Sequence, residues 1–312
     1  MTIDQVQRAH LTRVQDYIEE QLHKKLTLTH LAKVSTYSPY HFHRLFSEFT
    51  GETPADYVKR LRLEKAAHSL IYEPEKPVTD IAMDCGFSSL SYFTYTFHDA
   101  FQHSPKAWRE GGYLEKFPRI YVNSKKSKQD SSKRKENSPD PGYTGFQWID
   151  LNKVKVMVLP KREVILEHRL GEYSAEISQT WEHLYRYCEA REMMNESTML
   201  IGVPRNNPYL TPPEKCRYDC CISIEENHAI EGLEISVFDG GKYAVYEFEK
   251  PLDYSMRKQL IECYSELYSY WLPKSGYRHL GNPVEIVQIT SIAGSLELEC
   301  KIEAIALEIE PY

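Results

Sequence analysis

One pattern occurs twice in the first third of the chain, and the two copies are 51 residues apart. In each copy a short apolar segment is followed by a turn, a serine, a phenylalanine-rich segment and a Ser-Pro or Thr-Pro pair. Phe42 corresponds to Phe93, and Phe46 corresponds to Phe97. Repetition at a fixed interval marks a repeated structural unit. Each copy has the layout of two helices joined by a tight turn, so the sequence predicts two helix-turn-helix units.

The segment that follows Ser38 separates into an apolar and a polar face when it is drawn as a helix. Ser38 can cap the first turn, and Pro39 is tolerated at the first helical position. Phe42, Phe46 and their apolar neighbours recur at helical spacing and predict a buried stripe. An arginine on the other face can bond guanine through two hydrogen bonds. The alternative is an ordinary solvated surface helix. The side chains that we expect to contact DNA are Tyr40, His43, Arg44 and Ser47.

The second unit repeats this division, with Phe93 and Phe97 in the buried stripe. A long helix from about residue 54 to residue 70 is expected to hold the two units apart rigidly. Two recognition helices held in this way can enter successive major grooves, about 34 Å apart on one side of the duplex. The outward side chains that we expect at the DNA are Ser91, Tyr92 and Tyr95.

Residues 8–110 resemble the AraC/XylS transcription regulators. The resemblance implies a DNA-binding domain with two helix-turn-helix motifs, which activates transcription by contacting RNA polymerase. The second reading helix departs from the family, because it lacks the usual glutamines and arginine and carries Asp99. Sequence-specific readout is therefore expected to depend on the first helix. The most specific matching residues are Ile81-Ala82, Gly86-Phe87, Ser91-Tyr92-Phe93, Phe97, Phe101, Pro105 and Trp108-Arg109.

A basic segment separates the two halves of the chain. Residues 116–137 contain 8 Lys or Arg and 2 Asp or Glu, whereas the net charge of the whole chain is -7. High charge with low hydrophobicity is typical of a flexible tether. Attraction to DNA phosphates is a second possible role of this segment. We therefore expect a DNA-binding domain in residues 1–115, a basic linker in 116–142 and a second domain in 143–312.

The second half alternates strand and helix patterns in two similar sets. Each set has the order β-β-α-β-β, so the chain is expected to be multidomain: all-α first, then a duplicated α+β domain. Two antiparallel sheets packed side by side, each backed by a helix, are the expected architecture. The predicted helices cover residues 177–192 and 255–271. The predicted strands cover residues 154–159, 163–169, 199–204, 218–224, 233–238, 242–248, 284–289 and 296–307.

This half resembles the GyrI-like (gyrase-inhibitor-like) effector-binding domains that are fused to bacterial regulators. The resemblance implies a small-molecule site with a central glutamate among aromatic side chains. The matching segments are Gly171-Glu172-Tyr173, Thr211-Pro212-Pro213-Glu214, Arg217-Tyr218-Asp219, Gly240-Gly241-Lys242-Tyr243-Ala244-Val245, Trp271-Leu272-Pro273, Ser275-Gly276-Tyr277 and Val284-Glu285-Ile286.

Glu285 is the residue on which a ligand site is expected to depend. On a strand it shares one face with Val287 and Ile289, so its carboxylate lies in an apolar row. A buried charge needs a partner, which predicts either a cation or a retained proton. Aromatic faces beside one carboxylate suit a flat or amphipathic cation. The alternatives are core packing for the aromatic residues and an edge-strand position for Glu285. The expected aromatic lining is Trp181, Tyr185, Tyr218, Tyr264, Tyr268 and Trp271.

Other chemistries have weaker support in the sequence. Cys216, Cys220, Cys221 and His228 fit no common zinc spacing, so no metal site and no cofactor is expected. Seven cysteines scattered along the chain do not form a disulfide framework. With no secretory signal or membrane-spanning run, a cytoplasmic regulator is expected, with no catalytic residues. The competing hypothesis is a hydrolase of a reactive small molecule, in which Glu285 activates water as a general base.

Overall fold

The computed structural model describes residues 3–115, 149–174, 176–225, 230, 232–291 and 298–312. The chain forms two compact units, residues 1–126 and residues 127–312. The division between them falls inside the predicted linker, residues 116–142. The basic segment itself lies outside the described residues. No helix in the described part of the chain is both long enough and apolar enough to cross a membrane.

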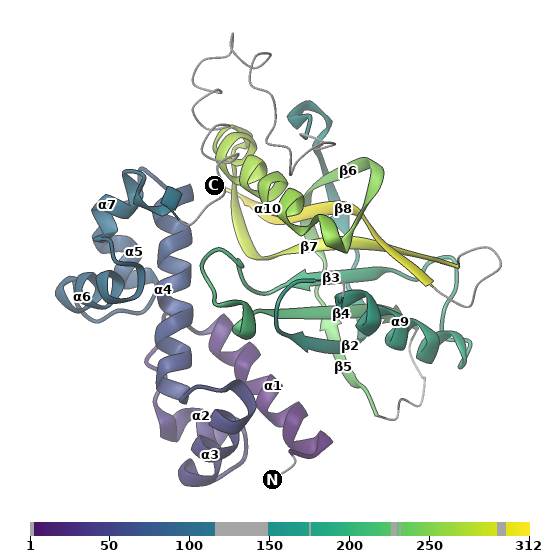
Figure 1. The fold of residues 1–312 in the computed structure, drawn as a ribbon, viewed down its shortest axis with the longest axis horizontal. Coiled ribbons are helices and arrows are strands. Elements are labelled where there is room, and N and C mark those ends of the chain that lie inside the picture. The colour runs from purple at the N-terminus through teal and green to yellow at the C-terminus, as the bar shows by residue number, and fades with distance from the viewer. Residues whose placement is uncertain (1–2, 116–148, 175, 226–229, 231, 292–297) are drawn as a thin grey trace. The chain divides into compact units, whose positions relative to one another are not determined.

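The first unit is entirely helical, and its two halves repeat the same local structure (Figure 1). Both recognition helices begin with a serine whose side chain accepts a hydrogen bond from the backbone three residues later, Ser38 in α3 and Ser89 in α6. Such a cap satisfies backbone donors that a helix start leaves unpaired. The helices are α1 (Gln5–Glu20), α2 (Leu28–Val34), α3 (Pro39–Thr50), α4 (Pro54–Tyr72), α5 (Val78–Asp84), α6 (Leu90–Phe101) and α7 (Pro105–Arg109), followed by the 3-10 turn η1 (Gly112–Glu115).

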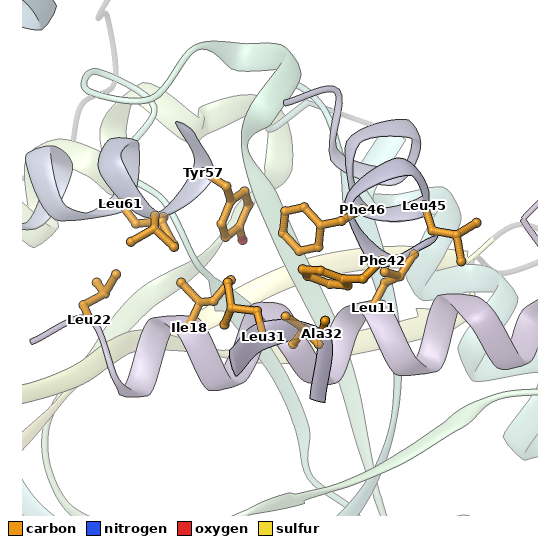
Figure 2. Close-up of a cluster of buried hydrophobic side chains, with 12 residues drawn as sticks. Leu11, Ile18, Leu22, Leu31, Ala32, Phe42, Leu45, Phe46, Tyr57 and Leu61 are labelled. Carbon is orange, nitrogen blue, oxygen red and sulfur yellow. The ribbon is translucent and has the colours of Figure 1, made fainter. Parts of the chain in front are cut away.

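Each helix-turn-helix unit packs on its own aromatic core. In the first, Phe42 and Phe46 of α3 lie against Leu11 and Ile18 of α1 and Tyr57 of α4 (Figure 2). Phe42, Phe46, Leu11 and Ile18 are fully buried. The close packing of phenylalanine on leucine and isoleucine fixes the back of α3, so its other face is turned outward. The predicted apolar stripe is confirmed.

The second unit uses the same packing with a tryptophan added. Phe97 and Phe101 of α6 pack on Trp108 of α7, with ring centroids 5.8 Å and 4.8 Å apart. The indole Nε1 of Trp108 donates a hydrogen bond to the Ala67 carbonyl of α4 at 3.2 Å. Helix α4 is therefore anchored to the second unit as well as to the first.

The turns of the two units reach the same shape with different residues. Gly86 in the second turn has φ +84°. A Cβ there would lie 2.2 Å from the carbonyl oxygen of Leu22, so only glycine fits. In the first turn the left-handed position is occupied by Thr36, with φ 65°.

The second unit contains one eight-stranded antiparallel sheet rather than the two sheets expected from the sequence. The two sets do repeat as β-β-α-β-β, but their strands hydrogen-bond to each other in the order β1-β6-β8-β7-β3-β4-β2-β5. The expectation of two sheets was wrong because the first strand of each set pairs with the other set. The strands are β1 (Lys155–Leu159), β2 (Arg162–Leu170), β3 (Leu200–Pro204), β4 (Arg217–Ile224), β5 (Glu234–Phe238), β6 (Gly241–Asp253), β7 (Tyr277–Ser291) and β8 (Leu298–Pro311).

The strand order is symmetric about its centre, where β3 of the first set meets β7 of the second. This seam is short, and its pairs are Ile201 with Ile286 and Gly202 with Glu285. Alternation along a strand sends neighbouring side chains to opposite faces. Ile201 and Ile286 therefore lie on the face of an apolar cluster that also contains Val284 and Ala306. Glu285 points to the other face.

The helices of the second unit are α9 (Glu176–Glu189) and a compound helix that follows the 3-10 turn η5 (Tyr254–Met256). The compound helix consists of α10 (Arg257–Glu266), the π-helical turn η6 (Leu267–Trp271) and α11 (Leu272–Ser275). Helix α9 packs on β2, β4 and β8. In Figure 1, α9 lies over one half of the sheet and α10 over the other. The side chain of Glu285 points toward this helical layer.

Candidate functional site

The outer face of α3 presents polar and aromatic side chains to solvent. Tyr40 is 83% exposed, which is unusual for so large a ring. His43 and Arg44 on the same helix are also exposed. Ser47 is only half-buried, and its hydroxyl oxygen is inaccessible to solvent. Three of the four side chains predicted to contact DNA are therefore accessible, whereas the hydroxyl of Ser47 is turned away.

The outer face of α6 has fewer charges and more aromatic surface. Ser91 is exposed, Tyr92 is 51% exposed and Tyr95 is 73% exposed. Tyr92 also contacts Phe87, with ring centroids 6.2 Å apart. The ring of Tyr95 is the more exposed of the two, so it is the better placed to contact an external partner.

Helix α4 sets the spacing between the two reading helices. It has 19 residues, and at 1.5 Å per residue its axis is about 28 Å long. One turn of DNA is about 34 Å. The helix begins after the Thr53 cap and runs on to Tyr72, with one unit packed near each end. Its length is therefore of the right order for two helices that enter successive grooves.

In the second unit the carboxylate of Glu285 is fully buried and fully engaged. Its Oε2 accepts a hydrogen bond from the Tyr218 hydroxyl at 2.6 Å. Its Oε1 accepts from Arg257 Nη1 at 2.7 Å and from the Tyr264 hydroxyl at 3.4 Å. Burial and the charge of Glu285 raise the pKa of Tyr218 well above its usual value, so this hydroxyl remains a donor. We call Glu285 and these three donors the Glu285 centre.

The cation that the sequence predicted for Glu285 is supplied by the chain itself. Arg257, the first residue of α10, forms a buried ion pair with the carboxylate. Burial alone would lower the pKa of Arg257, but the nearby Glu285 outweighs it and the pKa is raised. The guanidinium also lies over the rings of Tyr173 at 4.7 Å and Tyr218 at 5.3 Å. Sequence reasoning missed Arg257, although its seven-residue spacing from Tyr264 places both on one helical face.

Two further aromatic residues extend the Glu285 centre toward α9. The Tyr254 hydroxyl lies 3.0 Å from the Tyr218 hydroxyl and accepts a hydrogen bond from Trp181 Nε1 at 2.7 Å. Trp181, predicted as part of the lining, thus reaches Glu285 only through two tyrosines. Tyr254 and Tyr173 were not predicted.

Gly202 makes room for the hydrogen bond from Tyr218 to Glu285. A Cβ at position 202 would lie 1.8 Å from the Tyr218 hydroxyl. The side chain of Tyr218 therefore crosses β3 directly over the backbone of Gly202 to reach Glu285 on β7. Only glycine permits this close approach.

The remaining predicted lining residues lie in other contacts. The Tyr268 hydroxyl is 3.1 Å from Nε2 of His279. Trp271 stacks on Tyr277, with centroids 6.5 Å apart and an interplanar angle of 6°. Tyr185 is half-buried on α9. Among the described residues, none of these three hydrogen-bonds to the Glu285 carboxylate. Their aromatic character and helical position could not distinguish them from the side chains that do.

A second buried carboxylate lies on β4. Asp219 is fully buried, and it accepts hydrogen bonds from Arg205 Nε at 2.6 Å and from Arg217 Nε at 2.8 Å. Nδ1 of His168 lies 2.7 Å from Asp219 Oδ1, and its Nε2 lies 3.3 Å from Glu234. Burial would raise the pKa of Asp219, but the two arginines and His168 lower it well below the usual range.

The cysteines form neither disulfides nor a metal site in the described part of the chain. All seven are free and buried, and burial raises the pKa of Cys220 well above its usual value. No group of three or more His, Cys, Asp or Glu suited to a metal ion occurs among the described residues. His228 lies outside them.

Two family matches divide the chain in the same way as the fold. Residues 31–111 match a helix-turn-helix domain family, and residues 152–295 match the family of GyrI-like small molecule binding domains. The second match includes the whole of the Glu285 centre, and the first includes both reading helices.

Curated relatives match the first unit. The probable transcription factor PqrA of Proteus vulgaris is 38% identical over 100 residues, which are 31% of this chain and 81% of that protein. The probable transcriptional regulator LumQ of Photobacterium leiognathi is 36% identical over 104 residues, 33% of this chain and 42% of that protein. The transcriptional regulator YbfP of Bacillus subtilis (strain 168) is 33% identical over 119 residues, 35% of this chain and 40% of that protein. The chain thus spans less than half the length of LumQ and YbfP.

Proposed function

Because the chain belongs to the AraC/XylS family of helix-turn-helix transcription regulators and carries a GyrI-like domain, we propose that it is a sequence-specific, effector-controlled regulator. Its first unit binds promoter DNA, and its second unit binds a small effector at the Glu285 centre. Activation through contact with RNA polymerase is the proposed mode of action.

The exposed face of α3 is the observation that carries the DNA-binding proposal. Arg44 and His43 stand outward beside Tyr40, on a helix whose back is fixed by buried phenylalanines. A rigid helix that presents hydrogen-bond donors is suited to the major groove, where arginine reads guanine. The tyrosines of α6 are proposed to position the DNA backbone, because that helix offers few side chains for base readout.

Substitution of Arg44 by alanine tests base reading. We expect specific binding to weaken by about 1–3 kcal/mol, the contribution of one good base contact. Binding to random DNA should change much less. Arg13→Ala, which removes an exposed arginine from α1, is the matched control and should leave both affinities nearly unchanged. Equal losses on specific and random DNA for Arg44→Ala would refute the base-reading role.

The Glu285 centre supports effector binding better than hydrolysis. A general base needs a carboxylate oxygen that can accept a proton from water. Both oxygens of Glu285 already accept hydrogen bonds, and Oε1 is paired with Arg257. A carboxylate enclosed by donors and aromatic rings instead matches a receptor for a cationic aromatic compound. Turnover of a bound compound that depends on Glu285 would restore the hydrolase hypothesis.

A further inference from the structure

We propose that the Glu285 centre recognises an amidinium or guanidinium group, and that such a ligand binds by replacing the guanidinium of Arg257. This inference rests on the proposed function, in which Glu285 is the effector site. It adds the chemical class of the ligand and the group that the ligand displaces.

Arg257 is held in the way that an external cation would be held. Its Nη1 donates to Glu285 Oε1 at 2.7 Å. The flat guanidinium lies over the rings of Tyr173 and Tyr218, with distances of 4.7 Å and 5.3 Å from Cζ to the ring centroids. Planar cations gain from such aromatic contacts, and more so when water is excluded. The contacts of Arg257 therefore outline the shape and charge of the group that fits beside Glu285.

Arg257 is nevertheless an incomplete occupant. Its Nε–H is buried and has no hydrogen-bond acceptor among the described residues. A buried donor without a partner costs about 1–3 kcal/mol. An amidinium attached to an aromatic ring has carbon at the position of Nε, so it makes the same contacts without this unmet donor. The orphaned N–H is thus a specific reason for a ligand to replace Arg257.

The charge of the centre restricts the ligand further. A neutral compound that displaced Arg257 would leave Glu285 buried without a cation, which is strongly unfavourable. A quaternary ammonium ion carries the charge but has no N–H to donate to Oε1. An amidinium or guanidinium supplies the charge, the planar face and the donor together.

Access to Glu285 requires Arg257 to move. Glu285 is fully buried, and the side chain of Arg257 is only 9% exposed. Arg257 is the first residue of α10 and directly follows η5, which contains Tyr254. The Tyr254 hydroxyl in turn lies within hydrogen-bonding distance of Tyr218 and accepts from Trp181 of α9. Displacement of Arg257 would therefore alter contacts at the start of α10 and on α9, which couples ligand binding to both helices.

The test is calorimetric titration of the full-length protein with three probes of similar size. Benzamidine is the amidinium probe, benzamide is its neutral counterpart and benzyltrimethylammonium is a cation without N–H donors. We expect benzamidine to bind and the other two to bind far more weakly. Glu285→Gln should abolish the binding of benzamidine.

The decisive variant is Arg257→Met, which removes the competing guanidinium and keeps the length of the side chain. Benzamidine should bind this variant about tenfold or more tightly than the natural protein, because a competing state lowers apparent affinity. Arg257→Lys keeps the charge and is expected to give an intermediate affinity, so the test remains valid if Arg257→Met does not fold. Arg191→Met is the matched control, because Arg191 is an exposed arginine that stacks on Tyr187 at 3.8 Å.

The outcomes separate the two proposals. If benzamidine binds through Glu285 but equally to natural protein, Arg257→Met and Arg257→Lys, the displacement of Arg257 is refuted and the effector site stands. The same holds if benzyltrimethylammonium binds better than benzamidine. If no probe binds any folded variant, or if binding persists in Glu285→Gln, the effector site itself is refuted.

Discussion

Glu285 and Asp219 are both fully buried carboxylates of one sheet, but their surroundings differ. Asp219 is surrounded by two arginines and a histidine that arise from strands or from the loop after β3. Glu285 has a single cation, Arg257, which comes from the first turn of a helix and keeps an unmet donor. Several cations fixed by the sheet mark a carboxylate that holds structure together. One cation on a helix end marks a carboxylate whose partner can be exchanged.

The largest effect that this comparison predicts is on stability at Asp219. Asp219→Asn should lower the free energy of unfolding by about 3–5 kcal/mol, because it leaves buried cations without their counter-charge. Glu285→Gln should lower it less, since Arg257 lies at a helix end from which it can turn into solvent. Urea denaturation of both variants measures the difference. Equal losses would remove the distinction between the two carboxylates.

A smaller effect is expected at Gly202, which belongs to the Glu285 side of the comparison. Gly202→Ala places a Cβ against the Tyr218 hydroxyl, and such overpacking costs about 1–3 kcal/mol. The hydrogen bond from Tyr218 to Glu285 should be lost, and benzamidine affinity should change with it. In a Tyr218→Phe background the same glycine substitution should cost less, because the nearest atom is gone. An unchanged cost would show that Tyr218 does not cross Gly202.

The smallest predicted effect is the pH dependence due to His168. Burial and Arg217 lower the pKa of His168, but Asp219 and Glu234 outweigh them and raise it. A raised pKa in the folded state stabilises the fold fully below about pH 6.5, the unfolded value, and this contribution is lost as pH rises through the folded value. Each unit of the shift corresponds to about 1.4 kcal/mol.

His168→Gln should remove this pH-dependent step from the stability profile. The control is His183→Gln, because His183 is an exposed histidine that also pairs with a glutamate, Glu167. Denaturation series between pH 6 and pH 9 compare the two variants with the natural protein. A step that survives in His168→Gln would assign the pH dependence to another group.

Periodicity alone predicted the first unit well. The phenylalanine stripes are buried, the serine caps form, and Tyr40, His43 and Arg44 are exposed. These features depend on spacing within a single helix, which the sequence displays directly. Ser47 departs from the pattern because it lies near the edge of the buried stripe, where the helical period leaves a side chain half-covered.

The second unit was predicted less completely because its site depends on contacts between distant strands. The repeated β-β-α-β-β order was visible, but the exchange of first strands that creates a single sheet was not. The burial of Glu285 was expected, whereas its partner Arg257 resembled any polar residue at a helix start. Pairing of Gly202 with Glu285 at the central seam brings Tyr218 and Arg257 together. No local pattern contains that information.

The most direct test of the account is a footprint of the full-length protein on the DNA upstream of its own gene, with and without benzamidine. We predict protection of two segments one helical turn apart, and a change in that protection when benzamidine is added. The change should be absent in Glu285→Gln and present in Arg191→Met. Absence of a protected segment, or a benzamidine response that persists in Glu285→Gln, would contradict the account.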